Sequence, residues 1–123
     1  MGQWYVMLVD DEVDFVDTLA ERLRMRGFRA QAVTDGHEAL ALVEQEAPHL
    51  MIVDVMMPGL GGLDLLRHVK THYPDTQVIL LTGVGSTKEG IEGMRLGAFD
   101  YLMKPINIQE LIDKMNEALA KEV

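Results

Sequence analysis

The sequence contains no cysteine, and this absence excludes three kinds of chemistry. A disulfide framework, a thiolate metal site and a cysteine nucleophile all require that residue. The chemistry left to the chain is therefore that of carboxylates, hydroxyls, imidazoles and amines.

Long hydrophobic runs are missing as well. Runs such as Val78 to Leu81 span only a few residues, whereas a membrane-spanning helix needs about 18 or more apolar residues. The first residues also lack the basic start and the small-residue cleavage site of a secretion signal. We therefore expect a cytoplasmic protein with no segment in a membrane.

Basic residues are scarce relative to acidic ones. The chain has 11 lysines and arginines against 20 aspartates and glutamates, which gives a formal net charge of −9. A negative charge of this size repels phosphate backbones and anionic lipid surfaces. We therefore expect neither nucleic acid nor a membrane surface as a partner of this chain alone.

The remaining composition is typical of one globular domain. The chain has 123 residues, of which 48% are hydrophobic and 25% are charged. These values fit a compact domain with a sizeable core, and the length leaves little room for a second domain. We therefore expect a single domain over residues 1–123.

Short apolar segments alternate along the chain with longer amphipathic ones. The short segments are too brief for helices and predict five strands, at residues 5–9, 28–33, 50–53, 78–81 and 100–103. The other segments carry apolar residues at spacings of three and four, which predicts five helices. Strict alternation of strands and helices favours a doubly wound α/β fold with a five-stranded parallel sheet.

The predicted strands differ in their apolar pattern. Residues 7–9, 51–53 and 78–81 are apolar without alternation, which is typical of strands that are covered on both faces. The second and fifth strands are more mixed in composition. We therefore expect these two strands to be less central in the sheet.

Polar residues follow four of the predicted strands at the point where each strand ends. They are Asp10, Asp11 and Glu12 after the first strand, Asp54 after the third, Thr82 after the fourth and Lys104 after the fifth. The carboxyl ends of the strands in such a sheet meet at one edge. We therefore expect these side chains to surround one cleft.

Three neighbouring carboxylates at this cleft would repel one another. Two unit charges about 4 Å apart interact by ~4 kcal/mol at an effective dielectric constant of about 20. Lys104 offsets part of the repulsion, and a divalent cation would offset the rest. Oxygen donors without cysteine or a nearby histidine pair favour Mg²⁺ over zinc or copper.

A metal ion beside a carboxylate, an amine and a hydroxyl suits phosphoryl transfer. Catalysis of that reaction consists mostly of positioning and charge neutralisation. Asp54 would be the nucleophile and would become an aspartyl phosphate. Lys104 and Thr82 would contact the phosphoryl oxygens.

These residues, in this order, resemble the receiver domains of two-component response regulators, both chemotaxis-Y-like and NtrC-type. The resemblance runs from Val6 to about Leu119. The matching segments are Leu8-Val9-Asp10-Asp11-Glu12, Asp54 with Met57-Pro58 and Gly62, Leu81-Thr82-Gly83, and Asp100-Tyr101-Leu102-Met103-Lys104-Pro105. Each segment alone is a weak signal, but all of them in order are specific.

The resemblance implies a flavodoxin-like sheet with the strand order 2-1-3-4-5 and a phosphorylation site at its edge. Asp54 would accept a phosphoryl group from a sensor histidine kinase or a histidine phosphotransfer protein. Asp11, Asp54 and the backbone carbonyl of Met56 would bind Mg²⁺ directly, and Asp10 would act mainly through water.

The resemblance also implies how the signal leaves the site. Thr82 and Lys104 would hold the phosphoryl oxygens, Tyr101 would be the switch aromatic, and the Lys104–Pro105 peptide bond would be cis. The face made by the fourth helix, fifth strand and fifth helix would change shape. That change would alter binding to an output protein or domain, or to a second copy of the chain in a homodimer.

Such a domain is not an enzyme in the usual sense, because it promotes only its own phosphorylation and dephosphorylation. Two other functions use similar parts. A Mg²⁺-dependent phosphatase of the haloacid dehalogenase type needs a second aspartate two residues after the nucleophile, where this chain has Met56. A flavodoxin-like flavin-binding module would have a loop rich in serine, threonine and glycine after the first strand, where this chain has acidic residues.

Overall fold

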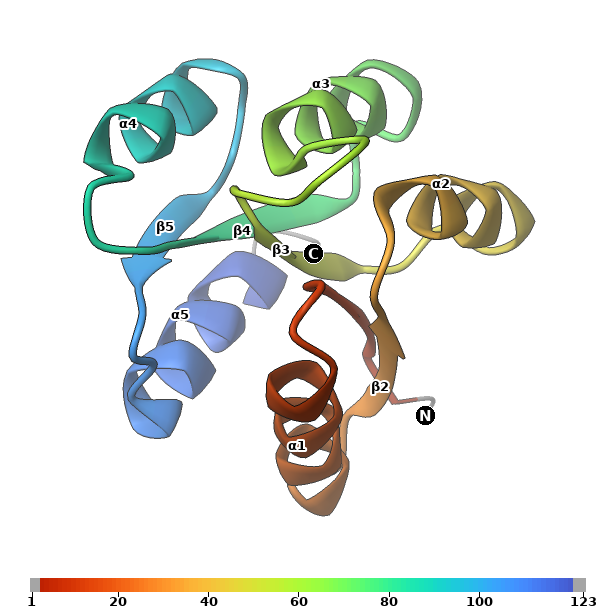
Figure 1. The fold of residues 1–123 in the computed structure, drawn as a ribbon. Helices are drawn as coiled ribbons and strands as arrows, with labels where there is room; N and C mark the ends of the chain where they lie inside the picture. Colours follow the sequence, from red (N-terminus) through yellow and green to blue (C-terminus); the bar gives the residue numbers. More distant parts are fainter. Residues whose placement is uncertain (1–2, 121–123) are drawn as a thin grey trace.

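A computed structural model of the chain describes residues 3–120. Its strands form one parallel sheet in the order β2-β1-β3-β4-β5, which confirms the expected fold and strand order (Figure 1). The strands are β1 (Tyr5–Val9), β2 (Arg29–Val33), β3 (Leu50–Asp54), β4 (Gln77–Thr82) and β5 (Asp100–Met103).

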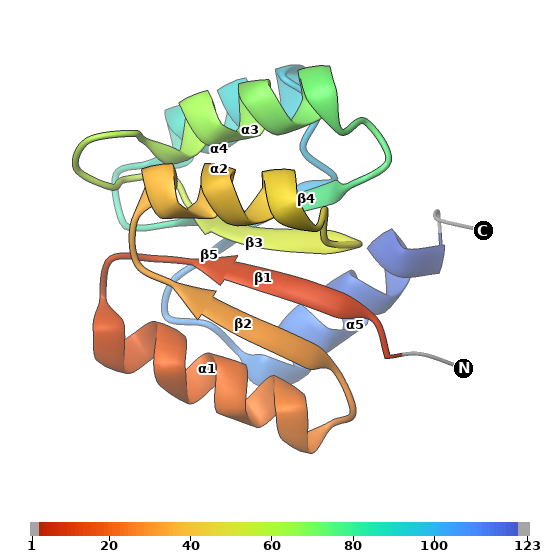
Figure 2. The ribbon, with the colours of Figure 1, turned by 90° about the vertical axis from the view of Figure 1, so that its right-hand side faces the viewer.

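Helices cover both faces of this sheet. They are α1 (Val13–Met25), α2 (Gly36–Gln45), α3 (Gly62–His72), α4 (Thr87–Arg95) and α5 (Ile108–Ala120). Helices α1 and α5 lie on one face, and α2, α3 and α4 lie on the other (Figure 2). Within residues 3–120, no helix is long and apolar enough to span a bilayer.

The central strands contribute to two hydrophobic layers at once. In β1, Val6 and Leu8 pack with α1 and α5, whereas Met7 and Val9 pack with α2 and α3. Every residue of β1 and β3 is buried. Because both faces of these strands are covered, their sequences do not alternate between apolar and polar residues.

The edge strands show the mixed composition that predicts their position. Within the described part of the chain, strands β2 and β5 each pair with one neighbour, and each carries partly exposed residues. The predicted start of β2 at Phe28 is one residue early, because the Phe28 amide donates to the Leu23 carbonyl at 3.1 Å and closes the turn after α1. At the other end of the central strands, Asp54 and Thr82 still pair with neighbouring strands and belong to β3 and β4.

Gly62 lets α3 begin directly against the end of β3. A Cβ atom at this position would meet the carbonyl oxygen of Asp54 and would lie 2.8 Å from the Cα atom of Val55. Both are backbone atoms, so neither can rotate away. The absence of a side chain at Gly62 therefore allows the close packing that helps to fix the backbone of Asp54.

We expect Gly62→Ala to lower the free energy of unfolding by about 1–3 kcal/mol, the usual cost of overpacking. Chemical denaturation followed by circular dichroism measures the change. Gly61→Ala is the matched control, because a Cβ there would lie 3.9 Å from the nearest backbone atoms, an ordinary contact. Equal losses in the two variants would contradict the role of the close approach.

Candidate functional site

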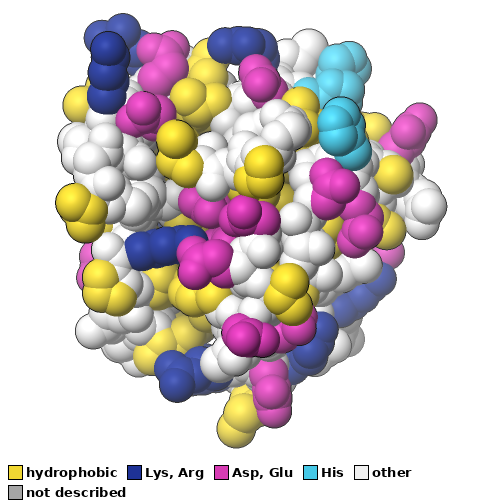
Figure 3. Space-filling view, in the orientation of Figure 1, with side chains coloured by type: hydrophobic (Ala, Val, Ile, Leu, Met, Phe, Trp, Pro, Cys, Tyr) yellow, Lys and Arg dark blue, Asp and Glu magenta, His cyan; other side chains and the backbone are white. Residues whose placement is uncertain are grey.

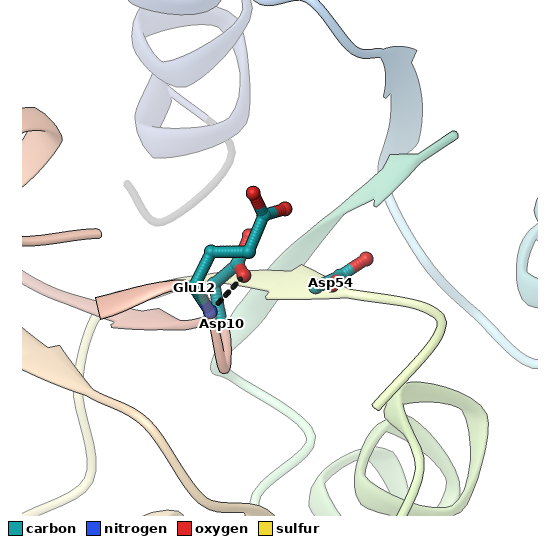
Figure 4. Close-up of side chains that lie close together, drawn as sticks. All are labelled: Asp10, Glu12 and Asp54. Carbon is teal, nitrogen blue, oxygen red and sulfur yellow. Dashed lines mark hydrogen bonds between the residues drawn. The ribbon is translucent and has the colours of Figure 1, made fainter. Parts of the chain in front are cut away.

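Acidic side chains from two neighbouring strands meet at the carboxyl edge of the sheet. Asp10 follows β1, and Asp54 is the last residue of β3, the strand beside it. Carboxylate oxygens of Asp10, Glu12 and Asp54 all lie within 4.8 Å of one another (Figure 4). In the space-filling view of this edge, acidic side chains gather near the middle next to a basic group (Figure 3).

Lys104 brings an ammonium group into this acidic cluster. Its Nζ atom lies 2.7 Å from Oδ2 of Asp10, 2.7 Å from Oε1 of Glu12 and 3.7 Å from Oδ2 of Asp54. The same Nζ atom lies 4.7 Å from the centre of the Phe15 ring. The sheet therefore joins Lys104 to carboxylates that are distant in the sequence.

The backbone around Lys104 fixes its approach to the cluster. The Lys104 amide donates to the carbonyl of Thr82 at 2.7 Å, which holds the residue at the end of β4. The Lys104–Pro105 peptide bond is cis, as the family resemblance predicts. Burial alone would lower the pKa of Lys104, but the close contacts with the carboxylates of Asp10 and Glu12 outweigh it and raise the pKa above its usual value.

Asp54 is buried and carries a shifted pKa. Its Oδ1 atom accepts a hydrogen bond from the Met56 amide at 3.3 Å. Burial, followed by repulsion from Asp10, raises the pKa of Asp54 to about 6, although Lys104 acts in the opposite direction. The side chain is therefore ionised above about pH 6 and protonated below it.

An open cavity of about 530 Å³ lies against this cluster. Asp11 lines this cavity but is not part of the close three-carboxylate group, in which Glu12 stands instead. The lining residues are Asp11, Glu12, Asp54, Met56, Gly83, Val84, Ser86 and Lys104. A ligand that enters the cavity would therefore meet carboxylates, the Lys104 ammonium and the exposed apolar side chains of Met56 and Val84.

The donor set fits a magnesium ion. Carboxylate oxygens from three residues converge within 4.8 Å, and further carboxylate comes from Asp11 at the same cavity. Mg²⁺ prefers oxygen ligands and keeps several waters, which an open cavity allows. Direct ligation by Asp11 and by the Met56 carbonyl stays a prediction.

The two residues predicted to form the switch lie on adjacent strands. Thr82 is fully buried, and its hydroxyl donates to the Leu102 carbonyl of β5 at 3.4 Å. Tyr101 is half-buried, and its ring packs against α4 where Gly90 has no side chain; a Cβ atom there would lie 3.0 Å from the ring. The Thr82 hydroxyl is thus engaged with β5 in this structure.

Sequence reasoning did not identify Glu12 as part of the charge cluster. The residue belongs to the acidic run at 10–12, but its contact is with a lysine 92 residues further along the chain. Its place after the first strand puts Glu12 near the cleft, but no known spacing signals the contact with Lys104. Glu12 directly precedes α1, and its amide donates to Oδ1 of Asp10 at 2.9 Å, which places its side chain within reach of Lys104.

Comparisons with known proteins find one family. A family model described as the response regulator receiver domain matches residues 6–116. The chain is 40% identical over 117 residues to the transcriptional regulatory protein CpxR of Klebsiella pneumoniae, across 94% of this chain and 49% of that protein. It is 37% identical over 117 residues to the regulatory protein VanRc of Enterococcus gallinarum, across 94% of this chain and 50% of that protein.

Solved structures show the same likeness. A response regulator receiver domain protein from Clostridium thermocellum matches with a TM-score of 0.93 and 30% identity, over 97% of this chain and 96% of that one. The receiver domain of NtrX from Brucella abortus matches with a TM-score of 0.89 and 33% identity, over 94% of this chain and 98% of that one. The chain spans about half the length of the curated relatives it matches.

The raised pKa of Asp54 makes stability depend on pH. The carboxyl ionises near 3.8 in the unfolded chain and near 6 in the folded one, so ionisation between these values favours unfolding. In metal-free buffer we expect Asp54→Asn to raise the free energy of unfolding at pH 7.5 by about 1–2 kcal/mol, allowing for solvent screening. The gain should shrink as the pH falls from about 6 to 4.

Chemical denaturation at several pH values, with a chelator present, measures this gain. Asp17→Asn is the matched control, because Asp17 is an exposed acid on α1. A gain that does not change with pH, or a loss at pH 7.5, would contradict the assigned pKa shift.

Proposed function

Because this chain belongs to the family of response regulator receiver domains, we propose that it is a phosphorylation-dependent signalling switch with Asp54 as the phosphoryl acceptor. The observation that carries the proposal is the buried Asp54 carboxylate, with Lys104 3.7 Å away, at the floor of an open acidic cavity. The donor would be a sensor histidine kinase or a histidine phosphotransfer protein.

We propose that residues 1–123 form one receiver domain of a two-component system, because the family match covers most of them. The match favours this function over an aspartyl-phosphate phosphatase and over a flavin-binding module. Such a phosphatase needs a second acid two residues after the nucleophile Asp54. This position holds Met56, whose side chain cannot serve as an acid. The segment after β1 carries Asp10, Asp11 and Glu12, and these acidic side chains would repel the phosphate of a flavin.

In the proposed reaction, an oxygen of ionised Asp54 attacks the phosphorus atom of the donor. The bond from phosphorus to the donor atom breaks, and the donor leaves with the electron pair. Lys104 then pairs with one phosphoryl oxygen. The Thr82 hydroxyl turns away from the Leu102 carbonyl and donates to a second phosphoryl oxygen. Water then attacks the phosphorus atom, the bond from phosphorus to the Asp54 oxygen breaks, and inorganic phosphate leaves, so that the site returns to its first state.

The proposed magnesium ligands are Asp11, Asp54 and the Met56 carbonyl, with Asp10 acting mainly through water. When bound, Mg²⁺ supplies positive charge that offsets the charge of the transferring group. Asp10 and Asp54 are held close together by their strands, so their repulsion in the folded chain favours binding of a cation.

Incubation with acetyl phosphate and Mg²⁺ should add one phosphoryl group to the wild-type chain and none to Asp54→Asn. Asp11→Ala and Lys104→Ala should slow the reaction by at least about tenfold, because charge stabilisation of a transferring group commonly contributes more than this. Intact-mass analysis over time measures both effects.

Lys88→Ala is a matched control for Lys104→Ala, because Lys88 is an exposed lysine on α4. It should react at the wild-type rate. Equal phosphorylation of the wild type and Asp54→Asn would reject Asp54 as the acceptor.

The proposed output surface is the face made by α4, β5 and α5. Ile91, Met94 and Met103 on this face are 49%, 41% and 51% exposed. Figure 3 shows hydrophobic side chains along the edge of the molecule on the side of α4 and β5. Large apolar side chains at the surface suit a protein partner, which would be an output protein or domain or a second copy of the chain.

We expect beryllofluoride, which mimics the phosphoryl group, to strengthen self-association of the wild type. Thr82→Ala and Tyr101→Ala should weaken this response, because the hydroxyl and the ring carry the change from Asp54 to α4. Analytical ultracentrifugation with and without beryllofluoride measures it. Tyr73→Ala, at the end of α3, is the control for loss of a half-buried tyrosine; equal responses in all variants would reject the switch.

A further inference from the structure

We propose that Glu12 is a positioning residue that holds the Lys104 ammonium away from Asp54 until the phosphoryl group arrives. This inference rests on the proposed function, since it concerns the same site. It assigns a role to the one carboxylate of the cluster that sequence reasoning did not single out.

The ammonium of Lys104 is shared unequally among three carboxylates. Asp10 and Glu12 each lie 2.7 Å away, whereas Asp54 lies at 3.7 Å. A lysine ammonium has three N–H donors, and short charge-assisted contacts are the stronger ones. Two partners at 2.7 Å therefore hold the ammonium on the side of β1, and the Asp54 carboxylate has only the weaker, longer contact.

Asp10 and Glu12 differ in how firmly they are held. The Asp10 side chain is 2% exposed, and its other oxygen accepts a hydrogen bond from the Glu12 amide at 2.9 Å. The Glu12 side chain is 64% exposed, although its backbone is fixed by that same hydrogen bond. Figure 4 shows Glu12 standing over Asp10, with Asp54 to one side.

This difference makes Glu12 the partner that Lys104 can leave. An exposed carboxylate regains water when its ion pair breaks, so the net cost is small. The free-energy cost is much larger when a buried carboxylate loses its ion-pair partner. A phosphoryl group on Asp54 would therefore draw Lys104 away from Glu12 and leave the contact with Asp10 in place.

Removal of the Glu12 carboxylate should shift Lys104 toward Asp54. Besides Asp10, the nearest remaining carboxylate is that of Asp54, 3.7 Å from the ammonium. The Phe15 ring, 4.7 Å from the ammonium, takes up space beside it. A closer pair between Lys104 and Asp54 occupies a carboxylate oxygen that the proposed metal site requires. We therefore expect Glu12→Gln to weaken Mg²⁺ binding, although Glu12 need not touch the ion.

A simple loss of negative charge would also weaken Mg²⁺ binding, and two variants separate the two causes. Glu12→Asp keeps the charge but shortens the side chain, so it cannot hold Lys104 in the same place. Lys104→Met removes the group that Glu12 is proposed to position. Positioning requires that Glu12→Asp resemble Glu12→Gln, and that neither change matter once Lys104 is methionine.

Titration calorimetry with Mg²⁺ on the full chain tests these requirements. We expect Glu12→Gln and Glu12→Asp to bind Mg²⁺ about two- to fivefold more weakly than the wild type, the factor that corresponds to a partly exposed ion pair. In the Lys104→Met background, Glu12→Gln should change the logarithm of the Mg²⁺ affinity by less than half as much as it does in the wild type. Asp14→Asn, which removes an exposed acid from the same helix start, should have little effect.

A metal-free measurement gives a second readout. The unfolding free energies of wild type, Glu12→Gln, Lys104→Met and the double variant, measured with a chelator, should show a favourable coupling between the two residues. The proposal is overturned if this coupling is absent, if Glu12→Gln binds Mg²⁺ as well as the wild type, or if Glu12→Asp behaves like the wild type. Phosphorylation of Asp54 in the wild type is measured separately, so failure of this inference is distinguishable from failure of the proposed function.

Discussion

Repulsion among carboxylates at one edge of the sheet is the constraint on which this site depends. Strands β1 and β3 are neighbours, so Asp10 and Asp54 stand side by side at their ends. The repulsion is sustained because burial of apolar strands fixes both backbones. Burial of the Asp54 carboxyl raises its pKa most, and the repulsion from Asp10 raises it further. Lys104, brought over from β5, offsets part of the repulsion and leaves an excess of negative charge that suits a cation.

The fold could be predicted from the sequence because its strands and helices differ in apolar pattern. Unbroken apolar runs in β1, β3 and β4 indicate burial on both faces, and the mixed composition of β2 and β5 indicates edges. The exact limits of the strands could not be predicted. They depend on hydrogen bonds such as the one from the Phe28 amide to the Leu23 carbonyl, which pattern alone does not reveal.

Part of the candidate site could be predicted in the same way. The rule that parallel strands present ligands at their carboxyl ends places Asp10, Asp54 and Lys104 together, and the structure brings them together. The contact of Glu12 with Lys104 joins residues 92 positions apart in the sequence and depends on how far the two side chains extend. The direction of the Thr82 hydroxyl depends on the rotamer of that side chain. The spacing of residues in the sequence predicts neither of these two features.

The contact between Gly90 and the Tyr101 ring has a consequence for how α4 is held. The ring occupies the space that a side chain on α4 would otherwise fill. If the half-buried ring turned elsewhere, the space beside Gly90 would lose its packing partner, and packed regions tolerate such gaps poorly. The helix would then settle into the gap. If the proposed switch operates, a change of charge at one end of the sheet would become a change of volume, and then of shape, at its side.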